Sequence, residues 1–214
     1  VLFGAGSMAY LEPSQVQRLA QGLAESHFRV LWALRNDDRL LLGQLPASVF
    51  KLKVGLPLGE IRHSFAPVLC AQSNLPQLAA IAHSAVRVVV SPCGLATAQE
   101  ALYYGKTLLC IPMLGDQLDV TTRLVDAGAA IALDKSRLDP AEIGRSIQAL
   151  HRNQSFRLAA KRLGKIIRST GGVAYAADIV ETVLRFGTDY FVPPEDEVRS
   201  PLLRCLPHAW FAPQ

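Results

Sequence analysis

The chain has 214 residues, of which 50% are hydrophobic and 19% are charged, so it can bury a full core and is not expected to be disordered. Its net charge is +4, but the basic residues do not cluster with interleaved aromatic residues, and we expect no binding to nucleic acid. No apolar run approaches the ~20 residues that cross a bilayer, and we expect no signal peptide.

The first predicted element is a strand over residues 1–3 that runs into a glycine-rich turn, Gly4–Met8. Glycines in such a turn let the backbone come close to a ligand. Gly6 and Ser7 are therefore candidate binding residues, with a free backbone N–H and a hydroxyl.

The next elements follow from the spacing of apolar residues. Helical spacing predicts a helix from Ser14, its N-cap, to about Ser26, and a strand follows from Arg29 to Leu34. We expect Trp32 to be a core residue. Residues 36–58 are irregular and read as a packed connection, after which Pro67–Gln72 is predicted to be a short strand.

Most of the functional signal lies between Leu75 and Asp119. Two short apolar runs, residues 86–90 and 107–111, each end in a polar or glycine-bearing turn that opens a helix. This pattern predicts a βαβ unit with both loops on one edge of a parallel sheet, where helix N-termini offer N–H groups to anions. The candidate binding residues at this edge are Gln77, Gly94, Thr97, Glu100, Asp116 and Gln117.

Beyond this stretch we predict a strand over residues 129–133 and three helices. The first helix begins after Asp139 and runs to about His151, and the others cover residues 154–168 and 172–186. Basic residues recur along the second of these helices, a pattern typical of a solvated helix face. The rest, residues 187–214, is a proline-rich tail.

The four cysteines are Cys70, Cys93, Cys110 and Cys205. They show no C-x-x-C spacing, and three lie in or beside apolar runs. We therefore expect buried free thiols, with neither a metal site nor a disulfide framework.

Strands that alternate with helices, without internal repeats, predict an α/β fold with a doubly wound, Rossmann-like parallel sheet. The predicted organisation is one domain over residues 1–186 followed by the tail. Because the chain begins directly with a strand, we expect it to be a domain of a longer protein.

The stretch from Leu75 resembles the nucleotide-sugar signature of UDP-glycosyltransferases, which lies in the C-terminal half of their two-domain GT-B fold. The residues that match the signature at its spacing are Pro76, Gln77, His83, Gly94, Glu100, Pro112, Asp116 and Gln117. The chain departs from it where Trp, His, Asn and Ser are usual, and there carries Asn74, Pro92, Ala96 and Thr97.

The resemblance implies a UDP-sugar as donor substrate, with no further cofactor. Gln77 would lie near the uracil and Glu100 would bind the ribose, since one carboxylate can accept from both hydroxyls of a diol. Asp116 and Gln117 would bind the sugar, although Asp116 could equally cap a helix. The diphosphate would lie near backbone N–H groups at Gly6, Ser7, Gly94 and Thr97.

In the resembled family, the general base is a histidine of the N-terminal, acceptor-binding domain. None of the histidines here matches it, and we expect His83 to be a structural residue. The general base is therefore expected to lie outside this chain, and the isolated chain should be inactive.

Two alternatives remain at this point. The substitutions at Asn74, Pro92 and Ala96 favour a degenerate module with weak or no nucleotide binding, which would act in interaction or regulation. A different GT-B-like enzyme, such as an epimerase, is the third reading. The sequence leaves open the sugar, the acceptor, a homo-oligomeric state, and whether the parent is cytoplasmic or anchored in the endoplasmic-reticulum membrane.

Overall fold

The computed structural model describes residues 1–4, 11–33, 51–54, 68–72 and 76–188. The chain divides into two compact units, residues 1–169 and residues 170–214. The predicted domain boundary at residue 186 stays a prediction, and the tail beyond residue 188 lies outside the described residues.

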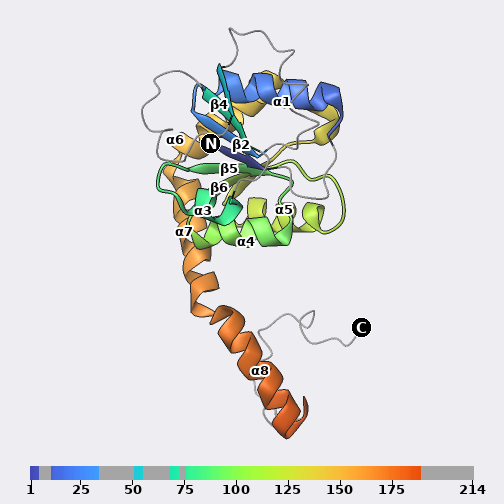
Figure 1. Ribbon diagram of the computed structural model, residues 1–214, viewed down its shortest axis with the longest axis vertical. Helices are drawn as coiled ribbons and strands as arrows, with labels where there is room; N and C mark the ends of the chain where they lie inside the picture. The colour runs from blue at the N-terminus through green and yellow to red at the C-terminus, as the bar shows by residue number, and fades with distance from the viewer. Residues whose placement is uncertain (5–10, 34–50, 55–67, 73–75, 189–214) are drawn as a thin grey trace. The chain divides into compact units, whose positions relative to one another are not determined.

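The described strands of the first unit form one sheet in which every pairing is parallel (Figure 1). The order across the sheet is β3-β4-β2-β1-β5-β6-β7. The strands are β1 (Leu2–Gly4), β2 (Val30–Ala33), β3 (Lys51–Val54), β4 (Val68–Gln72), β5 (Val88–Ser91), β6 (Thr107–Cys110) and β7 (Ala130–Ala132). This arrangement confirms the predicted doubly wound α/β fold.

The chain reverses its direction of strand addition between β1 and β5. From β1 it builds outward through β2 toward β3, whereas β5 pairs on the other side of β1 and is followed outward by β6 and β7. Loops diverge at such a switch point, and ligands of open parallel sheets bind there, at the carboxyl ends of the strands.

Helices cover both faces of the sheet. One core contains Phe3, Trp32 and Val90 packed against α1 (Pro13–Glu25) and α6 (Pro140–Arg152). The other core contains Leu2 and Val89 and faces α3 (Gln77–Ala82), α4 (Leu95–Tyr103) and α5 (Gln117–Asp126), which lie together below the sheet in Figure 1. Neighbouring residues of a strand therefore serve opposite cores, as the period of two requires.

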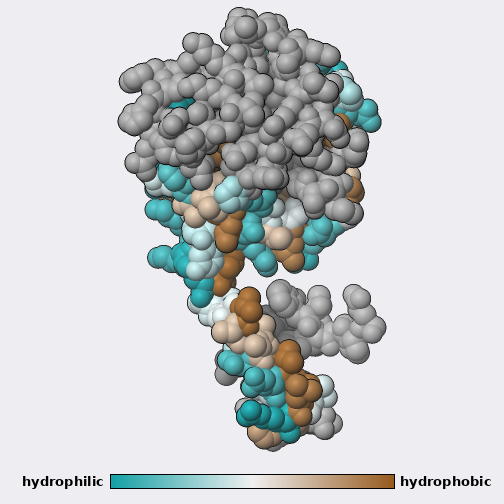
Figure 2. All heavy atoms as spheres, in the orientation of Figure 1, coloured by the Kyte–Doolittle hydropathy of each residue, from teal (hydrophilic) through white to brown (hydrophobic). Residues whose placement is uncertain are grey.

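The helices predicted over residues 154–168 and 172–186 lie close to the observed ones, whereas a short 3-10 helix was not predicted. A short 3-10 helix, η2 (Lys135–Arg137), precedes α6, and α7 (Gln154–Ser169) follows it. The second unit contains α8 (Gly172–Phe186), on which Figure 2 shows hydrophobic residues along one side and hydrophilic residues along the other. None of the described helices is long and apolar enough to cross a membrane.

Helix starts agree with expectation in one case and differ in another. Asp139 caps α6 as predicted, because its carboxylate accepts from the backbone N–H groups of Ala141 and Glu142. The N-cap of α1 is Glu12 rather than Ser14. Pro13 is the first residue of the helix, and the Glu12 N–H donates to the Gln15 Oε1 over 2.9 Å. The helix therefore starts two residues earlier than predicted.

Trp32 is fully buried, as predicted, and meets the Phe3 ring edge-on at 4.6 Å between centroids. The connection predicted over residues 36–58 contains the strand β3, which the sequence analysis missed. Its remaining residues lie outside the described part of the chain.

Candidate functional site

Three of the predicted binding residues meet at the switch point, beyond the carboxyl ends of β1 and β5. Gln77 begins α3, whereas Thr97 and Glu100 lie on the first turns of α4. The Gln77 Nε2 donates to the Glu100 Oε2 over 2.9 Å and to the Thr97 Oγ1 over 3.2 Å. All three side chains are half-buried, so they remain within reach of a ligand.

The end of β1 is adjacent to this group. A Cβ added to Gly4 would lie 3.6 Å from the Gln77 Oε1. Gly4, Gln77, Ser91 and Thr97 also help to line a cavity of about 10 Å³, the room that about one water molecule needs. The ends of β1 and β5 and the starts of α3 and α4 therefore converge on one place.

Gly94 and Asp116 come together beside it. Gly94 is the N-cap of α4, and nothing in the described structure lies within 4 Å of a Cβ added there. The Asp116 Oδ2 accepts from the backbone N–H of Leu95, the first residue of α4, over 3.3 Å. Asp116 occupies the N-cap position of α5 but makes no side-chain cap bond there, so the carboxylate serves the neighbouring helix instead.

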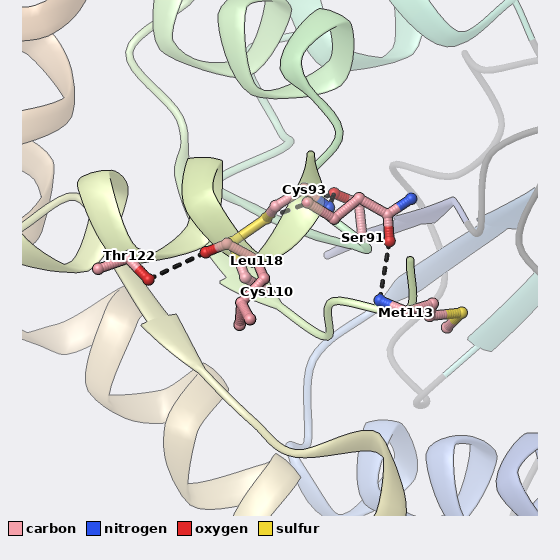
Figure 3. Close-up of a disulfide and its surroundings, with 7 residues drawn as sticks. Ser91, Cys93, Cys110, Met113, Leu118 and Thr122 are labelled. Carbon is pink, nitrogen blue, oxygen red and sulfur yellow. Dashed lines mark hydrogen bonds between the residues drawn. A yellow bond between two sulfur atoms is a disulfide. The ribbon is translucent and has the colours of Figure 1, made fainter. Parts of the chain in front are cut away.

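Gln117 is placed differently from the residues above. It is buried, and its Oε1 accepts from the backbone N–H groups of Met113 over 2.8 Å and Leu114 over 3.1 Å. The bond to Met113 is one of the dashed lines in Figure 3. These bonds fix the loop between β6 and α5, and contact of Gln117 with a sugar stays a prediction.

The other residues of the signature divide into three groups. Gly6, Ser7 and Asn74 lie outside the described residues. Pro92 is buried and Ala96 is exposed on the first turn of α4. His83 caps the end of α3, where its Nδ1 accepts from the N–H of Ala85, a structural bond within its own turn.

A disulfide joins Cys93 to Cys110 beneath the loop that carries Gly94 (Figure 3). The expectation of free thiols is therefore wrong for this pair. β5 and β6 pair with Ser91 opposite Cys110, and Cys93 follows two residues later in a left-handed conformation at φ 61°. The Cys93 N–H also donates to the Ser91 Oγ over 3.0 Å, so the start of α4 is anchored twice to the sheet.

Sequence reasoning missed this link and the contact between Asp116 and α4. The disulfide joins residues 17 positions apart, and the bond to Asp116 joins residues 21 positions apart. Both connect segments that follow or end the neighbouring strands β5 and β6. The sequence did contain an indication of the disulfide. Cys110 ends β6 and Cys93 follows the end of β5 by two residues, and the two strands are parallel neighbours. Among the described residues, no group of three His, Cys, Asp or Glu side chains is placed to hold a metal ion.

Comparison with known proteins identifies the family. A sequence model of the family described as "UDP-glucoronosyl and UDP-glucosyl transferase" matches residues 1–185. This chain belongs to the UDP-glycosyltransferase family. A UDP-glycosyltransferase of Talaromyces amestolkiae is 30% identical over 96% of this chain and 41% of its own length. UDP-glycosyltransferase 43 of Pueraria montana var. lobata is 33% identical over 62% of this chain and 28% of its own.

Solved structures agree with the fold. Os79 from O. sativa, in complex with UDP, matches 86% of this UDP-glycosyltransferase chain with a TM-score of 0.68 and 23% identity. A UDP-glucose:anthocyanidin 3-O-glucosyltransferase in complex with UDP matches 85% of it with a TM-score of 0.67. The chain covers 40% and 39% of these GT-B proteins, so it spans about two fifths of the length of each.

Proposed function

We propose that this chain is the donor-binding domain of an inverting glycosyltransferase that transfers a sugar from a UDP-sugar to a hydroxyl acceptor. The observation that carries the proposal is the convergence of Gln77, Thr97 and Glu100 at the sheet's switch point, beside the N-terminus of α4. In support, two solved structures with this fold are complexes with UDP.

Each group in the site suits one part of a UDP-sugar. Glu100 would accept from the two ribose hydroxyls, exchanging its bond from Gln77 for charge-assisted bonds to the ligand. The open space at Gly94 and the N–H groups of the first turn of α4 would receive the diphosphate. Asp116, at the same helix end, would accept from a sugar hydroxyl in place of the Leu95 N–H.

The whole enzyme would work by direct displacement at the anomeric carbon. A base from an acceptor-binding domain would remove the proton from the acceptor hydroxyl, the oxygen would attack, and UDP would leave with the electron pair of the broken bond. N–H groups at the start of α4 would stabilise the charge on the departing diphosphate. This chain alone should therefore bind UDP-glucose without transferring glucose.

The substitutions in the signature favour a second candidate, a degenerate module with weak or no nucleotide binding. Asn74 cannot offer the aromatic face that stacks on a base, which is worth about 1–3 kcal/mol. Pro92 brings no N–H and stands where the family pattern has a histidine. Together these losses would turn a micromolar site into a negligible one.

Titration calorimetry with UDP separates the two candidates. A donor site predicts binding of one UDP per chain, weakened about tenfold in Glu100→Gln, because a neutral amide replaces the charged acceptor. The matched control is Asp126→Asn, which removes a carboxylate at the exposed far end of α5 and should leave the affinity unchanged. Absence of binding at millimolar UDP would instead support the degenerate module.

A further inference from the structure

A basic hollow lies at the amino-terminal edge of the sheet, across the strands from the donor site. The turns before β5 and β6 and the segment that runs from the end of α6 into α7 line an open space of about 500 Å³. Its cations come from all three segments, and no carboxylate is among its lining residues. The five cationic side chains are Arg87, Lys106, Arg152, Arg157 and Lys161.

These positive charges are not neutralised within the described structure. The ion pairs among the described residues that involve arginine use Arg123, Arg145 and Arg185, none of which lines the hollow. Arg87, Arg152, Arg157 and Lys161 are exposed on its walls. Like charges gathered in one concavity repel each other, and an anion placed among them would relieve the repulsion.

Lys106 forms the floor of the hollow and is only 8% exposed. Its Nζ donates to the carbonyl oxygens of His83 over 2.9 Å and Val86 over 2.8 Å, and none of the carboxylates in the described ranges pairs with it. Burial, and then the charges of Arg87 and Arg157, lower the pKa of Lys106. The positive field therefore reaches the buried end of the hollow.

The walls are held in place by the backbone. Gly105, in the turn before β6, has φ +64°, and a Cβ there would lie 3.0 Å from the Lys161 Cγ. The aliphatic part of the Lys161 side chain therefore packs directly on Gly105. This contact fixes the start of the side chain that carries the ammonium group. This contact and the buried Lys106 hold two of the five cations in place, which lowers the cost of gathering them around an anion.

We propose that the basic hollow binds a compact anion that carries two or more phosphate groups. Its arginines suit phosphate oxygens through paired N–H donors. A concave space with cations on several walls fits a soluble polyphosphate better than the flat surface of a membrane. The basic hollow shares no residue with the donor site, so the proposal does not depend on UDP binding.

Calorimetry with inorganic tripolyphosphate tests the proposal on the full chain. One ion should bind per chain, and the double variant Arg157→Gln/Lys161→Gln should bind it about tenfold more weakly, because two charged donors are lost. The matched control is Arg162→Gln/Lys165→Gln, which removes two charges from the same helix outside the hollow and should leave the affinity almost unchanged. Circular dichroism would verify that both variants are folded.

Four results would overturn the proposal. Equal losses in the two double variants would show diffuse attraction to net charge, and no binding at millimolar tripolyphosphate would show that no site exists. Loss of binding in the presence of saturating UDP would place the ion in the donor site. Vesicles of phosphatidylcholine with and without phosphatidylserine provide the final arm, since binding to the anionic vesicles alone would indicate a membrane surface instead.

Discussion

At the scale of single residues, Glu100 is the centre of the proposed donor site, and its partner is Gln77 rather than a cation. An arginine or lysine beside Glu100 would compete with a neutral diol for the carboxylate, whereas an amide donor is exchanged at lower cost. The bond of 2.9 Å from the Gln77 Nε2 orients the Glu100 carboxylate. Gln77 would therefore act as a positioning residue for Glu100 and contact the base with its other atoms.

His151 provides a residue-scale prediction about charge. Its ring lies 4.5 Å from that of Phe28, and burial, followed by the nearby charges of Arg87 and Arg152, lowers its pKa from the ordinary value of 6.5. Removing one charge in Arg87→Gln should raise the midpoint in an NMR titration of the His151 ring. Arg123→Gln, which removes an exposed arginine on α5, should leave it unchanged.

The sign of the effect on stability follows from linkage. Because the folded protein holds this proton more weakly than the unfolded chain, His151 contributes stability above pH 6.5, and this contribution is lost as the pH falls through the folded pKa. An His151 midpoint at or above the ordinary value would contradict the assignment of a positive field around this residue.

At the scale of elements, the contact between α1 and α6 depends on the glycine at position 22 of α1. A Cβ on Gly22 would lie 2.6 Å from the Ile143 Cβ and 2.8 Å from the Pro140 carbonyl oxygen. Gly22→Ala should lower the free energy of unfolding by about 1–3 kcal/mol, because the two helices must move apart. Urea denaturation would measure the change.

The matched control lies across the same contact. A Cβ on Gly144 would come no closer than 3.3 Å to Glu25, and alanine gains about 1 kcal/mol of helix propensity over glycine. Gly144→Ala should therefore be close to neutral. Equal destabilisation by both substitutions would show that the close approach of α1 and α6 is not the reason why position 22 requires glycine.

The disulfide gives a second prediction at this scale. A bond between Cys93 and Cys110 closes a loop with a sequence separation of 17, and removing it in Cys93→Ala/Cys110→Ala should cost about 2–4 kcal/mol of unfolding free energy. Reductant should lower the melting temperature of the unaltered protein but not that of the double variant. Complete alkylation of both cysteines in unfolded, unreduced protein would contradict the bond.

The sequence predicts the elements well where local chemistry decides them. Apolar runs locate β5 and β6, and Asp139-Pro140 marks the start of α6. The strand β3, Lys51-Leu52-Lys53-Val54, was missed because a short alternating run at a sheet edge carries little hydrophobic signal. The disulfide joins segments that follow or end two strands which the βαβ pattern already makes neighbours, whereas the basic hollow also needs α6 and α7 beside them, which no local pattern reveals.

At the scale of the whole molecule, the two edges of one sheet have different chemistry. The carboxyl edge gathers half-buried polar side chains and helix N-termini, whereas the amino edge gathers cations around Lys106 that form no ion pair with another described residue. The sequence predicted the first edge, since its residues lie at family spacing. It did not predict the second, because the basic residues of α7 read as an ordinary solvated face until β5 and β6 bring Arg87 and Lys106 beside them.

A crystal structure of this chain soaked with UDP tests the central claim most directly. The account predicts that the ribose hydroxyls lie within hydrogen-bond distance of Glu100, with the base beside Gln77 and the diphosphate at the first turn of α4. It is contradicted if the bond between Gln77 and Glu100 persists with no nucleotide near it, or if UDP occupies only the basic hollow.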